Sequence, residues 1–258
     1  MGDMANAAGS LLTVFDAILP LHANWSIHDA AAGTNAKVYK CDGDVLFYVW
    51  IGDNQTNYSY IRVWAAWDAG THTGSGSQTS NILLTKSRAA YNIYVNGNRF
   101  IYINLSSTFC HGHYCGLIKR IDTSKKLVLV YGAASTSYYQ TYNWLAGYTE
   151  GTYVKLRLLE DVDGNADANA YPMGAGAGTN EHFFRDLDWN VRIRETAMFH
   201  KGGNPRYFIG YLDGIVCLMT TPVALPFGGG DIFTVNGMDW TVYWRSSNYE
   251  RFLVRLED

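Results

Sequence analysis

Residues 91–105 have the sequence YNIYVNGNRFIYINL, in which two runs rich in aromatic and β-branched residues flank Asn96-Gly97. Aromatic and β-branched side chains suit the pleated surface of a sheet. Asn-Gly between two such runs is the strongest short-range signal for a β-hairpin, because both residues tolerate positive φ. The stretch therefore predicts a hairpin formed by Tyr91–Val95 and Arg99–Leu105.

Segments of the same kind recur on both sides of this hairpin. Upstream, Lys37–Tyr39, Val45–Ile51 and Tyr58–Trp67 are predicted to form a three-stranded meander. Downstream, strands are predicted at Tyr114–Ile121, Leu127–Tyr131, Tyr153–Leu159, Asn190–Phe199, Tyr207–Leu212, Ile215–Met219, Ile232–Val235, Trp240–Trp244 and Phe252–Leu256, with a second Asn-Gly turn at Asn236-Gly237. Short strands separated by turn residues are typical of an antiparallel β-sandwich or of barrel-like lobes. We therefore expect an all-β fold.

One segment departs from this pattern and predicts a short N-terminal helix. Asp3–Leu19 carries apolar residues at helical spacing, and Pro20 is expected to end it. The apolar stripe consists of Leu11, Leu12, Phe15, Ile18 and Leu19.

Two Gly-rich stretches suggest how the chain is divided. Ala69–Ser80 is nearly all Gly, Ser and Thr, and Asp161–Thr179 is rich in Gly and Ala. We expect both to be surface loops that become ordered through contact with other subunits. The predicted organisation is a helix plus a β-rich lobe over 1–160, a loop or divider over 161–180, and a C-terminal β-rich lobe over 181–258.

Composition excludes several classes of protein. The 258-residue chain is 48% hydrophobic and 17% charged with a net charge of −3, which excludes global disorder and gives no basic excess for general nucleic-acid binding. The longest apolar run, Leu11–Leu21, is interrupted by Asp16 and Pro20 and is too short to span a membrane. Four Cys and an N-terminus without a basic stretch lead us to expect synthesis in a reducing cytoplasm.

Cys110-His111-Gly112-His113-Tyr114-Cys115 offers two sulfur and two imidazole ligands, which are the ligand types of zinc. In an extended strand, however, Cys110 and Cys115 face opposite sides, and no second ligand pair follows nearby. We therefore expect neither zinc nor a disulfide here. The expected arrangement is a strand with buried Cys and partly exposed His side chains.

A second metal candidate lies in the predicted divider. Asp161, Asp163, Asn165 and Asp167 place side-chain oxygens at every second position, as calcium or another hard cation prefers. An EF-hand is excluded because Ala166 occupies the position of the turn glycine and Pro172 that of the final Glu. These four residues are weak candidates for a metal site, and the alternative is a solvated turn that opens a loop.

Enzyme motifs are missing from the sequence. It contains no GxSxG elbow, no HExxH and no P-loop, and its seven His are scattered. Asp186 and Asp188, with Glu181 nearby, suggest a glycosidase pair, but such i, i+2 spacing is common near strands. We expect no enzymatic activity and no cofactor.

The aromatic residues are the remaining candidates for function. Most of the eight Trp are expected to pack within the sheets. Tyr138, Tyr139, Tyr142 and Trp144 lie in or next to a Ser/Thr/Gln-rich stretch and are predicted to bind a partner.

The sequences of the predicted strands and turns resemble those of virion structural proteins of tailed bacteriophages, of the tail, tail-tip and baseplate type. The resemblance rests on LPLHANWSIHD (19–29), AKVYKCDGDVLFYVWI (36–51), YIRVWAAWDAGTHTGSGSQT (60–79), NRFIYINLSSTF (98–109), YCGLIKRID (114–122), RYFIGYLDGIVCLMTTP (206–222) and GDIFTVNGMDWTVYW (230–244). It implies a virion component, made in the host cytoplasm, whose partners are copies of itself in a ring-like oligomer and other virion proteins rather than nucleic acid or membrane. It supplies no catalytic residues. The alternative functions are a carbohydrate- or receptor-binding module of a phage tail and, third, a glycan-cleaving enzyme.

Overall fold

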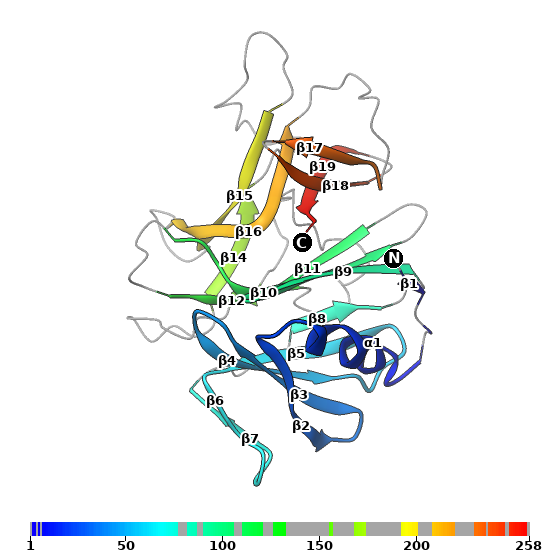
Figure 1. The fold of residues 1–258 in the computed structure, drawn as a ribbon, viewed down its shortest axis with the longest axis vertical. Coiled ribbons are helices and arrows are strands. Elements are labelled where there is room, and N and C mark those ends of the chain that lie inside the picture. Colours follow the sequence, from blue (N-terminus) through cyan, green and yellow to red (C-terminus); the bar gives the residue numbers. More distant parts are fainter. Residues whose placement is uncertain are drawn as a thin grey trace.

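The computed structural model describes residues 2–3, 5, 7–76, 82–86, 90–105, 110–120, 126–132, 155–156, 168–173, 192–200, 208–219, 230–235, 237–245 and 248–256. In this part of the chain, antiparallel strands predominate and one short α-helix lies near the N-terminus. The all-β prediction is confirmed. Figure 1 shows three sheets in succession, with the second sheet between the N-terminal and the C-terminal ones.

The N-terminal sheet contains the predicted meander. Its strand order is β2-β3-β4-β5-β8, and the strands are β2 (Trp25–Gly33), β3 (Ala36–Asp42), β4 (Leu46–Gly52), β5 (Tyr58–Trp64) and β8 (Ile82–Thr85). Strand β2 was not predicted, because a register shift between Ile27 and Asp29 breaks the alternation of its side chains.

The second sheet has the order β1-β9-β10-β11-β12. Its strands are β1 (Gly2–Asp3), β9 (Ala90–Asn96), β10 (Arg99–Leu105), β11 (Cys110–Leu117) and β12 (Val128–Tyr131). The predicted β9–β10 hairpin is confirmed, but the expectation that Asn96 and Gly97 are the two central residues of its turn is wrong. Asn96 pairs with Arg99 and neither Gly97 nor Asn98 has positive φ. Instead, Asn96 Oδ1 accepts hydrogen bonds from the N–H groups of Asn98 (2.9 Å) and Arg99 (3.0 Å) and thereby closes the turn.

The predicted helix begins later than expected. Helix α1 spans Ser10–Ile18 and is followed by a 3-10 turn, η1 (Leu19–Leu21), that contains Pro20 in its first turn. The prediction of a start at Asp3 is wrong, because Gly2–Asp3 pairs with β9 and Gly9 has a φ of 82°. The helix end at Pro20 is predicted to within two residues.

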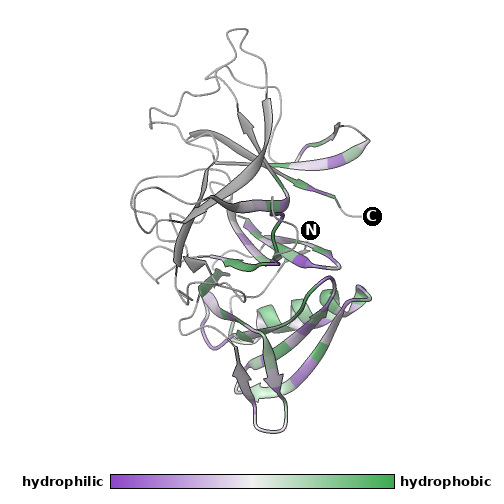
Figure 2. Ribbon diagram, turned by 90° about the vertical axis from the view of Figure 1, so that its left-hand side faces the viewer, coloured by the Kyte–Doolittle hydropathy of each residue, from purple (hydrophilic) through white to green (hydrophobic). Residues whose placement is uncertain are grey.

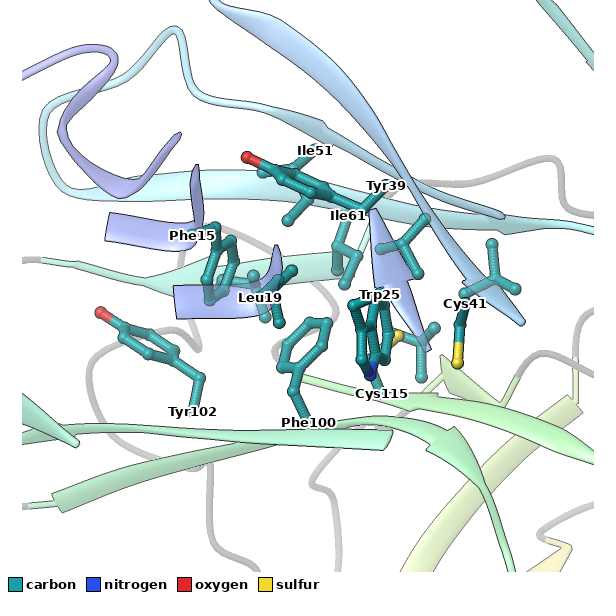
Figure 3. Packing of buried hydrophobic residues seen from close by; sticks show 14 of the residues in the cluster. Phe15, Leu19, Trp25, Tyr39, Cys41, Ile51, Ile61, Phe100, Tyr102 and Cys115 are labelled. Atoms are coloured by element: carbon teal, nitrogen blue, oxygen red, sulfur yellow. The ribbon is translucent and has the colours of Figure 1, made fainter. Parts of the chain in front are cut away.

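Helix α1 fills the space between the first two sheets. Its buried residues Leu11, Leu12 and Phe15 belong to the same core as side chains from both sheets. Figure 3 shows Phe15 and Leu19 between Tyr39 on one side and Phe100 and Tyr102 on the other. The Phe15 and Phe100 ring centroids are 5.0 Å apart. In Figure 2, hydrophobic and hydrophilic positions alternate along the strands beside the helix, as a one-sided core requires.

The N-terminus of α1 is fixed to the N-terminal sheet by a buried carboxylate. Asp53, directly after β4, accepts hydrogen bonds from the Leu11 N–H (Oδ2, 2.8 Å) and from Ser59 Oγ (Oδ1, 2.6 Å). Lys86 Nζ, after β8, donates to Asp53 Oδ1 and to the Ala7 carbonyl oxygen (2.6 Å). The side chains of Asp53 and Lys86 are both fully buried. Because α1 has no capping side chain of its own, Asp53 supplies the acceptor that its first turn lacks.

The C-terminal sheet has the order β13-β14-β15-β16-β19-β18-β17. Its strands are β13 (Lys155–Leu156), β14 (Ala168–Met173), β15 (Arg192–His200), β16 (Phe208–Met219), β17 (Ile232–Val235), β18 (Met238–Arg245) and β19 (Asn248–Arg255). Two predicted strands, Tyr207–Leu212 and Ile215–Met219, are joined in β16. Strand β14 lies inside Asp161–Thr179, so the expectation of an irregular loop is wrong for these six residues. The division of the chain at 161–180 stays a prediction.

Asp213 joins the second and third sheets. Its Oδ2 accepts a hydrogen bond from Arg99 Nε (3.0 Å), and its Oδ1 lies 3.0 Å from Lys119 Nζ. Arg255 lies 3.7 Å away and is the third cation around this carboxylate. The backbones of Lys119 and Tyr211 also exchange two hydrogen bonds, of 2.9 and 2.8 Å. The two sheets therefore share a polar junction.

Candidate functional site

The Cys/His segment lies in β11 and contributes to packing. Cys115 is fully buried in the core as a free thiol, and burial raises its pKa well above the ordinary value. His113 is also fully buried, with its ring stacked 5.4 Å from that of Tyr102, so the expectation of partly exposed histidines is wrong for this residue. Among the described residues, no three His, Cys, Asp or Glu side chains gather closely enough to hold a metal ion. The absence of zinc stays a prediction.

The other predicted site residues lie outside the part of the chain that the structure describes. These are the metal candidates Asp161, Asp163, Asn165 and Asp167 and the partner-binding candidates Tyr138, Tyr139, Tyr142 and Trp144. Their roles stay predictions.

The outer face of the N-terminal sheet, away from α1, carries a row of half-buried aromatic side chains. Strand pairing sets Tyr48 opposite Trp64, and Trp50 opposite Arg62. The Arg62 guanidinium lies 5.2 Å from the centroid of the Trp50 ring, at cation–π distance. Successive residues of a strand face opposite sides of the sheet. The neighbours of these residues in the sequence, such as Val49 and Val63, therefore point into the core.

The irregularity in β2 adds two polar residues to this face. Ile27 pairs with Tyr39 and Asp29 with Val38, so one extra residue, His28, lies between two consecutive pairs. The His28 ring contacts the Tyr48 ring at 4.8 Å. Asp29 is only 5% exposed although it carries a carboxylate.

The Asp29 carboxylate is satisfied by three donors. Its Oδ2 accepts a hydrogen bond from Trp67 Nε1 (2.9 Å) and lies 2.8 Å from His72 Nδ1, and its Oδ1 accepts from the Ala31 N–H (2.9 Å). Burial by itself would raise the pKa of Asp29, but these hydrogen bonds from His72, Trp67 and Ala31 hold it below the ordinary value. An ionised Asp29 therefore fixes the orientation of the His72 ring.

Trp67 and His72 belong to a hairpin formed by β6 (Ala66–Asp68) and β7 (Thr73–Ser75), which lies on the side of the sheet away from the second sheet (Figure 1). Strand β7 lies inside Ala69–Ser80, so the expectation of a loop is wrong for Thr73–Ser75, whereas residues 69–72 form the turn of the hairpin. Asp68 Oδ1 closes the turn by accepting a hydrogen bond from the Gly70 N–H (2.8 Å).

The hairpin packs closely against the aromatic row. Trp64 and Trp67 have ring centroids 6.0 Å apart. A Cβ atom at Gly74 would lie 2.2 Å from Trp64 Cδ2, so this close approach requires glycine. We call Asp29, Trp67 and His72, together with the neighbouring His28, Tyr48 and Trp64, the Asp29 cluster.

His72 is the member of the Asp29 cluster that is best placed to meet a ligand. Its side chain is 47% exposed, and its φ of 54° is unusual for a residue other than glycine. Because Nδ1 faces Asp29, Nε2 is the ring nitrogen left for a further partner. A buried carboxylate that orients an imidazole in this way is a common support for histidines that bind ligands.

Sequence reasoning missed the Asp29 cluster. His28 and His72 were noted only as two of seven scattered histidines, since Asp29 and His72 lie 43 positions apart in the chain. The bulge in β2 and the docking of the hairpin bring them together, and no short-range pattern in the sequence marks either event.

Comparisons with known proteins add no identification to this geometry. The chain matches no protein-family model and no curated protein sequence. Among the described residues, no helix has the length and apolar character needed to span a bilayer. The inference of function therefore rests on the sequence and the structure themselves.

Proposed function

We propose that the protein is a non-enzymatic structural subunit of a tailed-phage virion, acting in the tail, tail tip or baseplate by assembling with copies of itself and with other virion proteins. The sequences of the predicted strands and turns resemble those of such proteins over most of the chain. The low share of charged residues, 17%, supports the proposal because it reduces the desolvation cost of a large subunit interface. A ring-like homo-oligomer built from heterologous contacts is the expected form.

The free edge of the C-terminal sheet is the observation that carries this proposal. Among the described strands, β17 is the last in the order of its sheet and pairs only with β18. Its Ile232 is 59% exposed, and Met238, at the start of β18, is 42% exposed. Exposed apolar residues on an edge strand favour pairing with another chain, because an edge presents backbone donors and acceptors beside them.

The proposal predicts that a charge at the edge weakens assembly. Ile232→Lys is expected to raise the dissociation constant of self-association about tenfold or more, since charged edge residues block strand pairing. Light scattering after gel filtration over a range of protein concentrations measures this change. Leu21→Lys is the matched control, because Leu21 is an apolar residue that is 84% exposed but lies in η1, outside the C-terminal sheet.

Two outcomes would contradict the proposal. One is a wild-type protein that stays monomeric at high concentration and does not co-purify with phage particles. The other is an equal loss of association in Ile232→Lys and Leu21→Lys, which would show that the edge has no special part in assembly.

Carbohydrate or receptor binding is the second candidate function. The Asp29 cluster favours it, because half-buried aromatic rings beside an oriented imidazole suit a small polar ligand better than a flat protein surface. This function is compatible with an assembled subunit.

A further inference from the structure

The hairpin tip holds His72 in a conformation that its own backbone disfavours. Positive φ is uncommon outside glycine and persists where surrounding contacts impose it. Here the imposing contact is the 2.8 Å approach of His72 Nδ1 to the nearly buried Asp29 carboxylate. The same carboxylate accepts the Trp67 indole N–H, so it fixes an imidazole and an indole ring together.

The groups around His72 are apolar rings and neutral hydrogen-bonding groups. The half-buried Trp67 ring shares the Asp29 carboxylate with His72, and the half-buried Tyr48 ring lies against His28, the residue before Asp29. Thr71 and Thr73 flank His72 at the exposed tip, and their hydroxyl oxygens lie 2.7 Å apart. Two more polar atoms of the cluster, Trp64 Nε1 and His28 Nε2, are buried without a hydrogen-bond partner, which is unusual for buried polar atoms.

Most charges near the cluster are held in local contacts. Asp29 is satisfied by three donors. Lys40 on the neighbouring strand pairs with Asp42 at 2.7 Å, and Arg62 lies over Trp50. Asp68, in the same hairpin, is a second carboxylate and is held by the Gly70 N–H (2.8 Å), so the site gives little attraction to an anion. It instead combines rings that pack against C–H groups with an imidazole and hydroxyls that exchange hydrogen bonds, which is the combination that a neutral sugar requires.

We propose that the Asp29 cluster binds a neutral saccharide. His72 Nε2 hydrogen-bonds to a sugar hydroxyl, and Tyr48 and Trp67 pack against the C–H face of the ring. Asp29 is a positioning residue that acts through His72 and Trp67. The proposal goes beyond assembly and does not rest on it, because the cluster lies on the N-terminal sheet and the β17 edge on the C-terminal one.

The test uses the full-length protein and an array of immobilised neutral oligosaccharides, four to six units long, of glucose, galactose, mannose and N-acetylglucosamine. We expect wild-type protein to bind at least one of them, with the dissociation constant then measured by calorimetry. His72→Gly is expected to weaken this binding at least tenfold. Glycine suits the positive φ of this position, so the variant removes the imidazole without straining the turn.

His22→Ala is the matched control, since His22 is a half-buried histidine next to η1, outside the Asp29 cluster. It is expected to bind as wild type does. Circular dichroism checks that both variants are folded. The proposal is overturned when wild-type protein binds none of the neutral oligosaccharides at millimolar concentration, when it binds only anionic polysaccharides, or when His72→Gly and His22→Ala bind equally. Self-association, measured separately, tells a failure here from a failure of the assembly proposal.

Discussion

Replacing Asp53 by alanine is expected to lower the free energy of unfolding by about 3–5 kcal/mol, the usual cost of removing one partner from a buried ion pair. The substitution leaves the fully buried Lys86 ammonium without its counter-charge. It also removes the acceptor for the Leu11 N–H at the start of α1. Urea denaturation followed by tryptophan fluorescence measures the effect.

Asp42→Ala is the control for this prediction. Asp42 also pairs with a lysine, Lys40, at 2.7 Å, but its side chain is 62% exposed. Since exposed ion pairs contribute little to stability, we expect only a small change. Equal destabilisation by the two substitutions would show that the Asp53–Lys86 pair does not anchor the helix.

A double variant distinguishes the cost of leaving a buried charge unpaired from the cost of losing the hydrogen-bond acceptor at the start of α1. Asp53→Leu with Lys86→Met removes both charges, and replacing a buried ion pair by apolar residues is often close to neutral. We therefore expect the double variant to be more stable than Asp53→Ala. It should remain less stable than wild type by about 1 kcal/mol, because the first turn of α1 still lacks its acceptor.

Replacing Asp213 by asparagine is expected to have an effect of similar size, about 3–5 kcal/mol, because it removes the negative charge that the buried Arg99 side chain, Lys119 and Arg255 share. Lys119, with a side chain that is 51% exposed, contributes little to this loss. The junction between the second and third sheets is weakened, so limited proteolysis is expected to cut the variant between them sooner than wild type.

Stability against pH gives an independent check on Asp213. Burial by itself would raise its pKa, but the charges of Arg99, Lys119 and Arg255 hold it below the ordinary 3.8. A carboxyl with a lowered pKa in the folded state contributes stability that is fully present above its unfolded value and is lost as the pH falls through the folded one. We therefore expect wild type to lose stability below about pH 4, and Asp213→Asn to show a shallower loss there. Parallel acid profiles of the two proteins would contradict this role for Asp213.

Local patterns in the sequence were sufficient to predict most of the strands that the structure describes. The meander over 36–64 follows from alternation between buried and less buried side chains, as in β5, and the hairpin over 91–105 from aromatic and β-branched runs on both sides of a short turn. The end of α1 near Pro20 is equally local, since proline lacks the backbone N–H that a longer helix needs. Where a bulge or a very short strand interrupts the alternation, as in β2 and β1, prediction failed.

Patterns in the sequence are therefore sufficient to predict the all-β class, the strand pairs joined by short turns and the position at which the helix ends. Which polar groups meet depends on the tertiary structure. Asp53 reaches Lys86 across 33 positions, Asp29 reaches His72 across 43, and Asp213 reaches Arg99 across 114. The reason is physical: alternation of hydrophobic side chains is a property of neighbouring residues, whereas a contact between distant charges depends on sheet register, on bulges and on the packing of one sheet against the next.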